Sequence, residues 1–254
     1  MNSSEDYWES AAFQLRRYSV QVAEEGFGAV YGAEDYDSFL IPHQGRVVRH
    51  ELDGGTTEVG HVSAYSLLAD AVMEHGDCPV MVADSHTQDL YEMAEAVYQV
   101  GSSAFREELE LEQWGGDVLF IAKLELDRSV RGIGLGHAVT YSVIRRFGAG
   151  RSLVLIKPFP LQFCGTLGKG ATPEHREAFE AAQRRLQTYY GTMGFELLQG
   201  APSYMVMDLD WRQPSWDAAL ASWRRLKGAE PVQAAAEGAL RLVHSTTCGG
   251  KEDS

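Results

Sequence analysis

Hydrophobic and polar residues alternate along much of the first half of the chain, a two-residue period that is typical of half-buried β-strands. Apolar and polar residues take turns from Arg46 to Leu52, Asp53-Gly54-Gly55 is a turn signal, and Glu58 to Leu68 resumes an extended, mostly apolar run. This pattern predicts an antiparallel hairpin. The residues before it predict a short helix over Tyr7 to Arg17 and strands over Tyr18 to Val22, Ala29 to Tyr31 and Phe39 to Ile41.

The period then changes to that of a helix. Leu90, Met93, Ala94 and Val97 share one face of a helix expected from about Thr87 to Val100, with Asp84 or Ser85 as its cap and Gly101 as its end. From Asp117 the pattern predicts a β-turn-α-β unit. Its parts are a strand over Asp117 to Leu126, a glycine turn over Arg131 to Gly136, a helix over Ala138 to Phe147 and a strand over Ser152 to Ile156.

A second helix has a clear start signal, because Thr172-Pro173-Glu174 supplies a cap, a proline and an acidic residue in that order. We expect this helix to run to about Tyr190, Gly194-Phe195 to break it, and Ser203 to Leu209 to form a final strand. Residues 1–210 are therefore expected to form one α/β domain. Residues 211–254 are expected to be a helical extension, with helices through Trp216 to Leu226 and Pro231 to Val243, and a polar tail.

Composition narrows the class of partner. The 254 residues are 44% hydrophobic, which suits a globular protein with a sizeable core, and acidic residues outnumber basic ones 36 to 22. A net charge of −14 argues against broad binding of nucleic acid, which needs a cationic surface. The three cysteines are unpaired in pattern, the N-terminus does not resemble a signal peptide, and no apolar run is long enough for a membrane helix. We expect a cytoplasmic protein that binds neither membrane nor nucleic acid.

The clearest candidate for a binding site is the segment from Leu126 to His137. A buried strand leads directly into three alternating glycines, Gly132, Gly134 and Gly136, and then into a helix, so backbone N–H groups converge where an anion can bind. The dinucleotide pattern G-x-G-x-x-G does not fit, because its third glycine would be His137 or Val139. An ATPase P-loop at Gly168-Lys169 fails as well, because Gly170 replaces the required hydroxyl residue.

The turn instead reads R-x-x-G-x-G, from Arg131 through Gly132, Ile133, Gly134 and Leu135 to Gly136, and resembles the acyl-CoA pyrophosphate loop of the GNAT superfamily of N-acyltransferases. Downstream, Leu186 to Glu196 is similar to the closing helix-and-strand motif of that family, with Tyr190 four residues before Gly194-Phe195. The resemblance covers about Arg46 to Leu209 and is best defined from Asp117 onward. It departs from the family in the segment Thr87 to Glu112, which precedes the loop and is expected to shape an acceptor site.

The resemblance implies a mixed, centrally splayed sheet flanked by helices, with acetyl-CoA as cosubstrate and no metal. The pantetheine arm would lie between the strands ending at Leu126 and Ile156, and an N–H near Leu126 would polarise the thioester oxygen. The phosphates would meet Arg131 to Gly136 and His137. Tyr190 would protonate the leaving thiolate, and Glu125, or less favourably Asp117, would accept a proton from the amine.

The expected reaction is transfer of an acetyl group to a small-molecule or protein amine by a monomer or homodimer. The histidines His50, His61 and His86 lack the spacing of metal ligands, which agrees with a reaction that needs no metal. The alternative is a catalytically silent module of the same fold that binds CoA or a partner protein.

Overall fold

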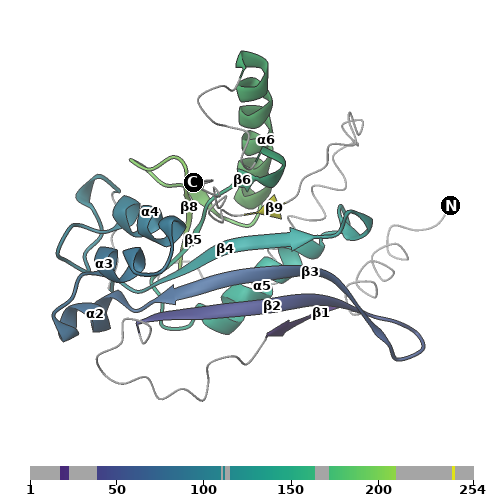
Figure 1. Cartoon of the computed structure of the whole chain (residues 1–254), viewed down its shortest axis with the longest axis horizontal. Coiled ribbons are helices and arrows are strands. Elements are labelled where there is room, and N and C mark those ends of the chain that lie inside the picture. Colours follow the sequence, from purple (N-terminus) through teal and green to yellow (C-terminus); the bar gives the residue numbers. More distant parts are fainter. Residues whose placement is uncertain are drawn as a thin grey trace, which may run out of the picture.

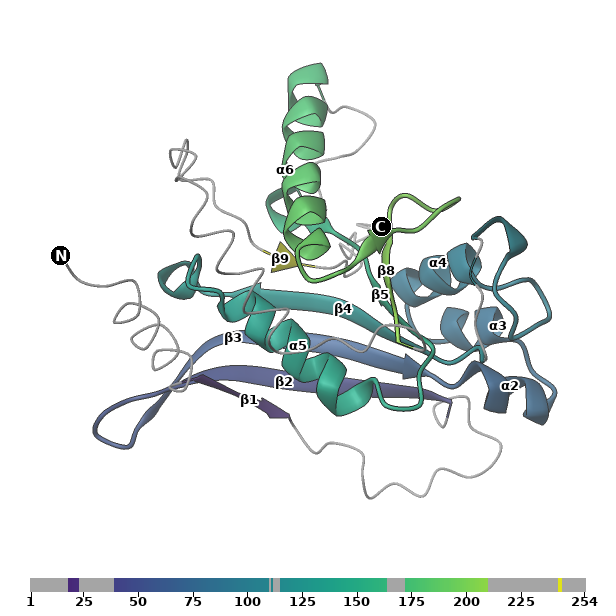
Figure 2. The ribbon, with the colours of Figure 1, turned by 180° about the vertical axis from the view of Figure 1, so that it is seen from behind.

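The computed structural model describes residues 18–22, 39–109, 111, 115–163, 172–209 and 242–243. Its centre is a seven-stranded mixed sheet in the order β1-β2-β3-β4-β5-β8-β7, with helices packed on both faces (Figures 1 and 2). The expected mixed α/β fold, a sheet flanked by helices, is therefore confirmed.

The main sheet contains β1 (Tyr18–Val22), β2 (Leu40–His50), β3 (Thr56–Leu67), β4 (Val118–Leu126), β5 (Leu153–Ile156), β7 (Glu196–Leu197) and β8 (Met205–Asp208). A separate two-stranded sheet pairs β6 (Phe159–Pro160) with β9 (Leu242–Val243). The α-helices are α2 (Ala69–His75), α3 (Pro79–Asp84), α4 (Gln88–Val97), α5 (Leu135–Phe147) and α6 (Pro173–Gly191). Short 3-10 helices span Glu107–Leu109, Arg128–Val130 and Leu161–Phe163.

The predicted hairpin is formed by β2 and β3, but its first strand is longer than expected. The separate strands predicted over Phe39 to Ile41 and Arg46 to Leu52 are wrong, because β2 runs without a break from Leu40 to His50. Pro42 interrupts the sequence pattern without ending the strand. It lies beyond the residues of β2 that pair with β1, which begin at Gly45, so its missing N–H removes no bond on that side.

The β-turn-α-β unit forms as predicted, with β4 and β5 pairing in parallel and α5 crossing the sheet between them. Residues of β4 are buried on both faces. Leu119, Ile121 and Leu124 belong to the cluster that includes α5, whereas Val118 and Phe120 belong to the cluster that includes α2, α3 and α4. The two cores explain why this strand reads as a continuous apolar run.

The segment between β3 and β4 forms three helices where the sequence predicted one. Thr87, rather than Asp84 or Ser85, caps α4, and its hydroxyl accepts a hydrogen bond from the Leu90 N–H at 3.3 Å. The helix ends at Val97 and does not reach Gly101, because Tyr98 turns to extended backbone and its hydroxyl donates to the Gly116 carbonyl at 2.5 Å.

The later part of the chain follows the prediction up to β8. Thr172 caps α6, as expected, by accepting a hydrogen bond from the His175 N–H at 3.3 Å. The helix expected over Pro231 to Val243 is wrong at its end, since Leu242 and Val243 form β9. The remainder of that helix, the helix through Trp216 to Leu226, the helix over Tyr7 to Arg17 and the strand over Ala29 to Tyr31 lie outside the described residues.

Candidate functional site

The glycine turn connects the end of β4 to the start of α5. Gly132 and Gly134 both adopt left-handed backbone, with φ of 76° and 86°, which L-residues with a side chain rarely adopt. A Cβ added to Gly132 would meet no atom within 4 Å, so backbone conformation rather than space accounts for glycine there. Val130 is buried just before the turn and holds it against the core.

The start of α5 offers N–H groups without helical partners. Gly134 is the N-cap residue, and no side chain caps this end of the helix. The amides of Leu135, Gly136 and His137 are the first N–H groups of α5, and such groups have no acceptor within their own helix. The partial positive charge of the helix end adds to them. This arrangement suits a phosphate or a carboxylate.

The Arg131 side chain stabilises the turn by hydrogen bonds to the last residue of β4. Its Nε and Nη2 atoms donate hydrogen bonds to the Leu126 carbonyl oxygen at 2.8 Å and 2.6 Å. The guanidinium thus ties the last residue of β4 to the far side of the turn. A contact of Arg131 with phosphate stays a prediction, because the bonds seen here serve the shape of the turn.

Beside the turn, β4 and β5 separate. Their parallel ladder covers only Val118 to Ile121 against Leu153 to Ile156, although β4 continues to Leu126. Lys157 and Pro158 follow β5, and proline has no N–H with which to extend the ladder. The last residues of β4 beyond the ladder correspond to about 16 Å of extended strand. We call the region beside these residues, which β9 occupies between β4 and β6, the β4–β6 slot.

Main-chain groups of β4 point into this slot. The Asp127 N–H donates to the Val59 carbonyl at 2.8 Å, which makes the neighbouring pair of Gly60 and Leu126 a pair without mutual hydrogen bonds. In an antiparallel ladder such a residue directs its N–H and C=O away from its partner strand. Leu124 therefore presents its main-chain N–H and C=O to the side of β5, as an extended ligand would require. Leu126 presents its N–H in the same way, whereas its carbonyl is held by Arg131.

The slot contains β9. This strand pairs with β6 and lies beside the C-terminal half of β4, close to the lower end of α6 (Figures 1 and 2). A ligand extended along β4 would have to take the place of Leu242 and Val243. Competition between β9 and a ligand is a direct consequence of this arrangement.

Tyr190 lies in the last turn of α6 and is part of the core that α6 shares with α5. Its side chain is completely buried, and its ring meets those of Tyr189 and Phe195 edge to face, with centroids 5.2 Å and 5.8 Å apart. Burial raises the pKa of Tyr190 well above its usual range, so the phenol keeps its proton at neutral pH. The phenol thus has a proton to donate, but the raised pKa makes it a weaker acid, and full burial means that a substrate must open a path to it. The role of Tyr190 as an acid stays a prediction.

His137 is buried where α5 meets α6. Its ring stacks on Tyr189 at a centroid distance of 4.1 Å, and its Nε2 lies 3.2 Å from the Thr192 hydroxyl. Burial lowers the pKa of His137 to about 4, so the ring is neutral at pH 7. The Nδ1 atom is buried and has no hydrogen-bond partner among the described residues. The predicted phosphate contact of His137 stays a prediction, because the contacts seen here pack α5 against α6.

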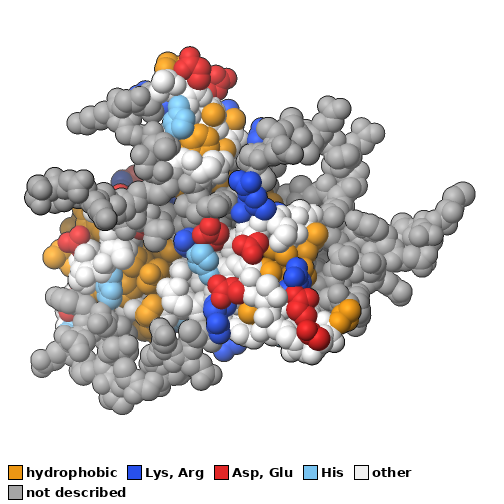
Figure 3. Space-filling view, turned by 45° about the vertical axis from the view of Figure 1, so that its right-hand side comes forward, with side chains coloured by type: hydrophobic (Ala, Val, Ile, Leu, Met, Phe, Trp, Pro, Cys, Tyr) orange, Lys and Arg blue, Asp and Glu red, His pale blue; other side chains and the backbone are white. Residues whose placement is uncertain are grey.

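Glu125 lies on the sheet face opposite α5, as the alternation along β4 predicts. Its carboxylate is 3.2 Å from the Lys123 Nζ and 3.4 Å from the His61 Nε2, and its side chain is partly exposed. Burial and the Lys123 ammonium lower the pKa of His61. Figure 3 shows acidic, basic and histidine side chains interspersed over this part of the sheet. A substrate approaching β4 from this face would meet Glu125.

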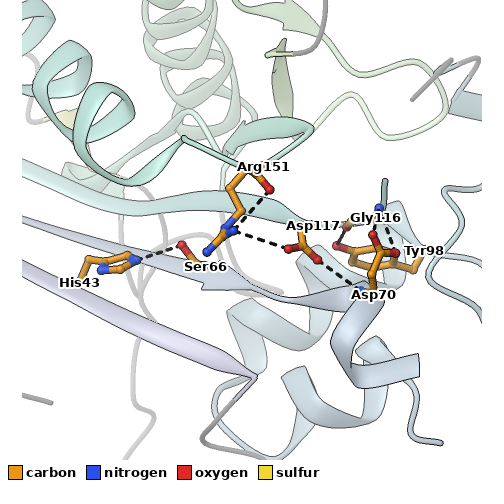
Figure 4. A network of polar contacts seen from close by, with 8 residues as sticks. His43, Ser66, Asp70, Tyr98, Gly116, Asp117 and Arg151 are labelled. Atoms are coloured by element: carbon orange, nitrogen blue, oxygen red, sulfur yellow. Dashed lines mark hydrogen bonds and ion pairs between the residues drawn. The ribbon is translucent and has the colours of Figure 1, made fainter. Parts of the chain in front are cut away.

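Asp117 is remote from the glycine turn. It precedes β4, about 30 Å along the strand from Leu126. Its Oδ2 lies 3.5 Å from Arg151 Nη1, and its Oδ1 accepts a hydrogen bond from the Asp70 N–H at 3.2 Å (Figure 4). Asp70 in turn accepts a hydrogen bond from the Gly116 N–H. This network ties the start of β4 to α2 and β5, which makes Asp117 a structural residue.

A polar cluster that sequence reasoning missed lies where β4 and β5 part. Lys157 Nζ is 2.8 Å from Glu92 Oε2 and 3.7 Å from Asp89 Oδ1, and 5.7 Å from the centre of the Tyr204 ring. We call Asp89, Glu92, Lys157 and Tyr204 the α4 cluster. A signal existed in the sequence, since Asp89 and Glu92 are three residues apart and share one face of a helix. Their convergence with Lys157 and Tyr204 depends on the fold.

The structure thus brings Leu126, Arg131 to Gly136 and the slot together at one end of β4, with Glu125 on the adjacent face. Tyr190 and His137 are buried where α6 meets α5. Among the described residues no group of three or more His, Cys, Asp or Glu side chains is arranged to hold a metal ion. None of the described helices has the length and apolarity to cross a bilayer. Comparison with models of known protein families, with curated proteins and with solved structures finds no match to this chain.

Proposed function

We propose that this protein is an N-acyltransferase that uses an acyl-CoA, most simply acetyl-CoA, and that its fold is of the GNAT type. The observation that carries the proposal is that two features lie next to each other. β4 separates from β5, so that its main chain can bind an extended ligand. The N-terminus of α5, which has no side-chain cap, follows the left-handed glycines at the C-terminal end of β4. The first feature suits a pantetheine arm and the second a pyrophosphate. The motifs around Arg131 and Tyr190 support the same proposal.

In the proposed reaction, the amine nitrogen attacks the thioester carbon while both substrates are bound. The C–N bond forms, the C–S bond breaks, and the carbonyl oxygen is stabilised during attack by an N–H of β4 near Leu126. The amine loses a proton to Glu125 or to water, and the CoA thiolate gains one from Tyr190. Exchange of protons with water then returns Glu125 and Tyr190 to their starting states, so atoms and charges balance without a metal or a redox partner.

The test is binding of CoA by calorimetry, followed by release of free thiol from acetyl-CoA in the presence of a panel of amines. Gly134→Ala places a side chain at a positive φ in the turn, and Gly54→Ala does the same in the β2–β3 turn, where nothing lies within 4 Å. Each costs about 1 to 2 kcal/mol of backbone strain. We expect at least a tenfold loss of CoA affinity, about 1.4 kcal/mol, in Gly134→Ala only.

Two outcomes would contradict the proposal. Absence of any heat with millimolar CoA would exclude the binding site, and equal CoA affinity of the two glycine variants would show that the turn does not contact the ligand. Full burial of Tyr190 favours the second candidate, a silent CoA-binding module. Binding of CoA without thiol release from any amine would support that candidate.

A further inference from the structure

The α4 cluster lies at the inner end of the β4–β6 slot. Lys157 directly follows Ile156, the last residue of β5 that pairs with β4. Tyr204 packs against Phe120, with ring centroids 6.4 Å apart. Phe120 is next to Ile121, the last residue of β4 that pairs with β5. In the proposed function the acyl group would reach this end of the slot, because the pantetheine arm extends along β4 from the glycine turn.

The cluster carries an excess of negative charge. Among the described residues, two carboxylates converge on the single ammonium of Lys157. The Asp89 and Lys157 side chains are only 11% and 17% exposed, whereas the Glu92 side chain is 43% exposed and opens the cluster to solvent. A partly buried carboxylate pair with one cation has capacity for a second cation, since burial strengthens its attraction for positive charge.

Tyr204 supplies an independent sign of a ligand. Its hydroxyl is buried without a hydrogen-bond partner among the described residues, and the whole residue is 4% exposed. Burial and the Glu92 and Asp89 carboxylates raise the pKa of Tyr204, so the hydroxyl stays neutral. Lys157 Nζ lies 5.7 Å from the centre of the Tyr204 ring, which places this residue against the cluster. A buried hydroxyl without a partner costs about 1 to 3 kcal/mol, a cost that a bound donor or acceptor would offset.

We propose that Asp89, Glu92 and the Tyr204 hydroxyl bind one positive charge of a di- or polycationic amine, whose other amino group receives the acyl group. This inference rests on the proposed function and specifies its acceptor. The acceptor class follows from the chemistry of the cluster. Carboxylates and a phenol oxygen accept hydrogen bonds from an ammonium, and a monoamine would leave this site unfilled whenever its only nitrogen lay at the thioester.

The experiment compares 1,4-diaminobutane with butylamine, which has the same carbon chain and one charge. Calorimetry without CoA measures binding of each probe, and thiol release from acetyl-CoA measures turnover. We expect the wild-type protein to bind and use the diamine at least tenfold better than butylamine. Glu92→Gln should abolish most of this preference without changing the KM for acetyl-CoA. Glu95→Gln on the same helix, whose carboxylate accepts a hydrogen bond from Tyr91 at 3.0 Å, should keep it.

Tyr204→Phe keeps the test decisive if Glu92→Gln folds poorly. Removal of an unpartnered hydroxyl should leave thermal stability equal or higher, while affinity for the diamine falls severalfold. Equal use of both probes by a wild-type protein that binds CoA and releases thiol would overturn this inference and leave the proposed function standing. Binding of the diamine by a protein that binds no CoA would overturn the proposed function and leave the cation site standing.

Discussion

His137 and Tyr189 hold the start of α5 against the end of α6, and their stacking has a consequence for stability. The pKa of His137 falls from 6.5 to about 4 on folding, so the unfolded chain binds more protons between these values. The contribution of the neutral His137 to the free energy of unfolding is therefore fully present above pH 6.5 and declines as the pH falls toward 4. One such group contributes about 2 kcal/mol of loss between pH 7 and pH 5.

We therefore expect His137→Gln to flatten the pH dependence of the unfolding free energy between pH 6.5 and pH 4.5, measured by urea denaturation. His43, whose pKa burial also lowers to about 4, keeps part of the slope in this variant. The exposed His50 provides the control, because His50→Gln also removes one histidine but leaves the contact between α5 and α6 intact. Parallel curves for the wild type and His137→Gln would show that the ring is not buried in the neutral state.

Individual residues were predictable from sequence where their partners are neighbours in the chain. Thr172 caps α6 through the amide three residues later, and the glycines of the turn need a backbone that only glycine adopts easily. The burial of Tyr190 and the convergence of Lys157 on α4 were not predictable. Both depend on packing between elements that are far apart in sequence, and local sequence patterns do not predict such contacts.

Among the elements, β3 and β4 pack closely against each other at Gly60. A Cβ at this position would lie 2.2 Å from the Glu125 carbonyl oxygen and 2.8 Å from Leu126 Cδ2. Both contacts are closer than any real Cβ contact, and the first involves main chain that cannot yield without moving β4. The close approach of β3 to β4 at this point therefore positions the strand that borders the slot.

Gly60→Ala should consequently destabilise the protein by about 3 kcal/mol or more, as expected for overpacking against rigid backbone. Thermal denaturation followed by circular dichroism would measure the change. Gly191→Ala is the matched substitution, since an added Cβ at the end of α6 meets nothing within 4 Å and alanine favours a helix. A Gly60→Ala protein as stable as Gly191→Ala would contradict the close approach of the two strands.

The elements most accurately predicted are those whose periodicity is long and uninterrupted. The strand, helix and strand from β4 to β5 agree with the sequence pattern to within three residues at each end. The helices α2 and α3 were missed because each is only about two turns or fewer and shows too few repeats of the helical period. β2 was divided in two because residues 42–45, a proline, two polar residues and a glycine, show no alternation of apolar and polar positions. Their pairing with β3 makes them part of one strand.

At the scale of the whole molecule, the order of strands decides what the slot can hold. The sequence predicted that β4 and β5 would be parallel neighbours, because a helix connects them. It did not predict that β8 would pair with β5 or that residues 242–243 would return to β6, since neither contact follows from a local pattern. The return matters for function, because β9 lies where the proposed pantetheine arm would bind.

A chain that ends at Arg241 should therefore bind CoA more tightly than the full chain. A molecule with β9 in the slot cannot bind CoA, so the apparent affinity for CoA is the intrinsic affinity multiplied by the fraction of molecules whose slot is open. Removal of β9 opens the slot in every molecule. A chain that ends at Val243 is the control, because it loses the following residues and keeps β9. Calorimetry with CoA should give the full chain and the Val243 chain similar affinities and the Arg241 chain a severalfold higher one. If all three bind CoA equally, β9 does not compete for the slot, and if the Arg241 chain binds more weakly, β9 instead supports the strand that the ligand needs.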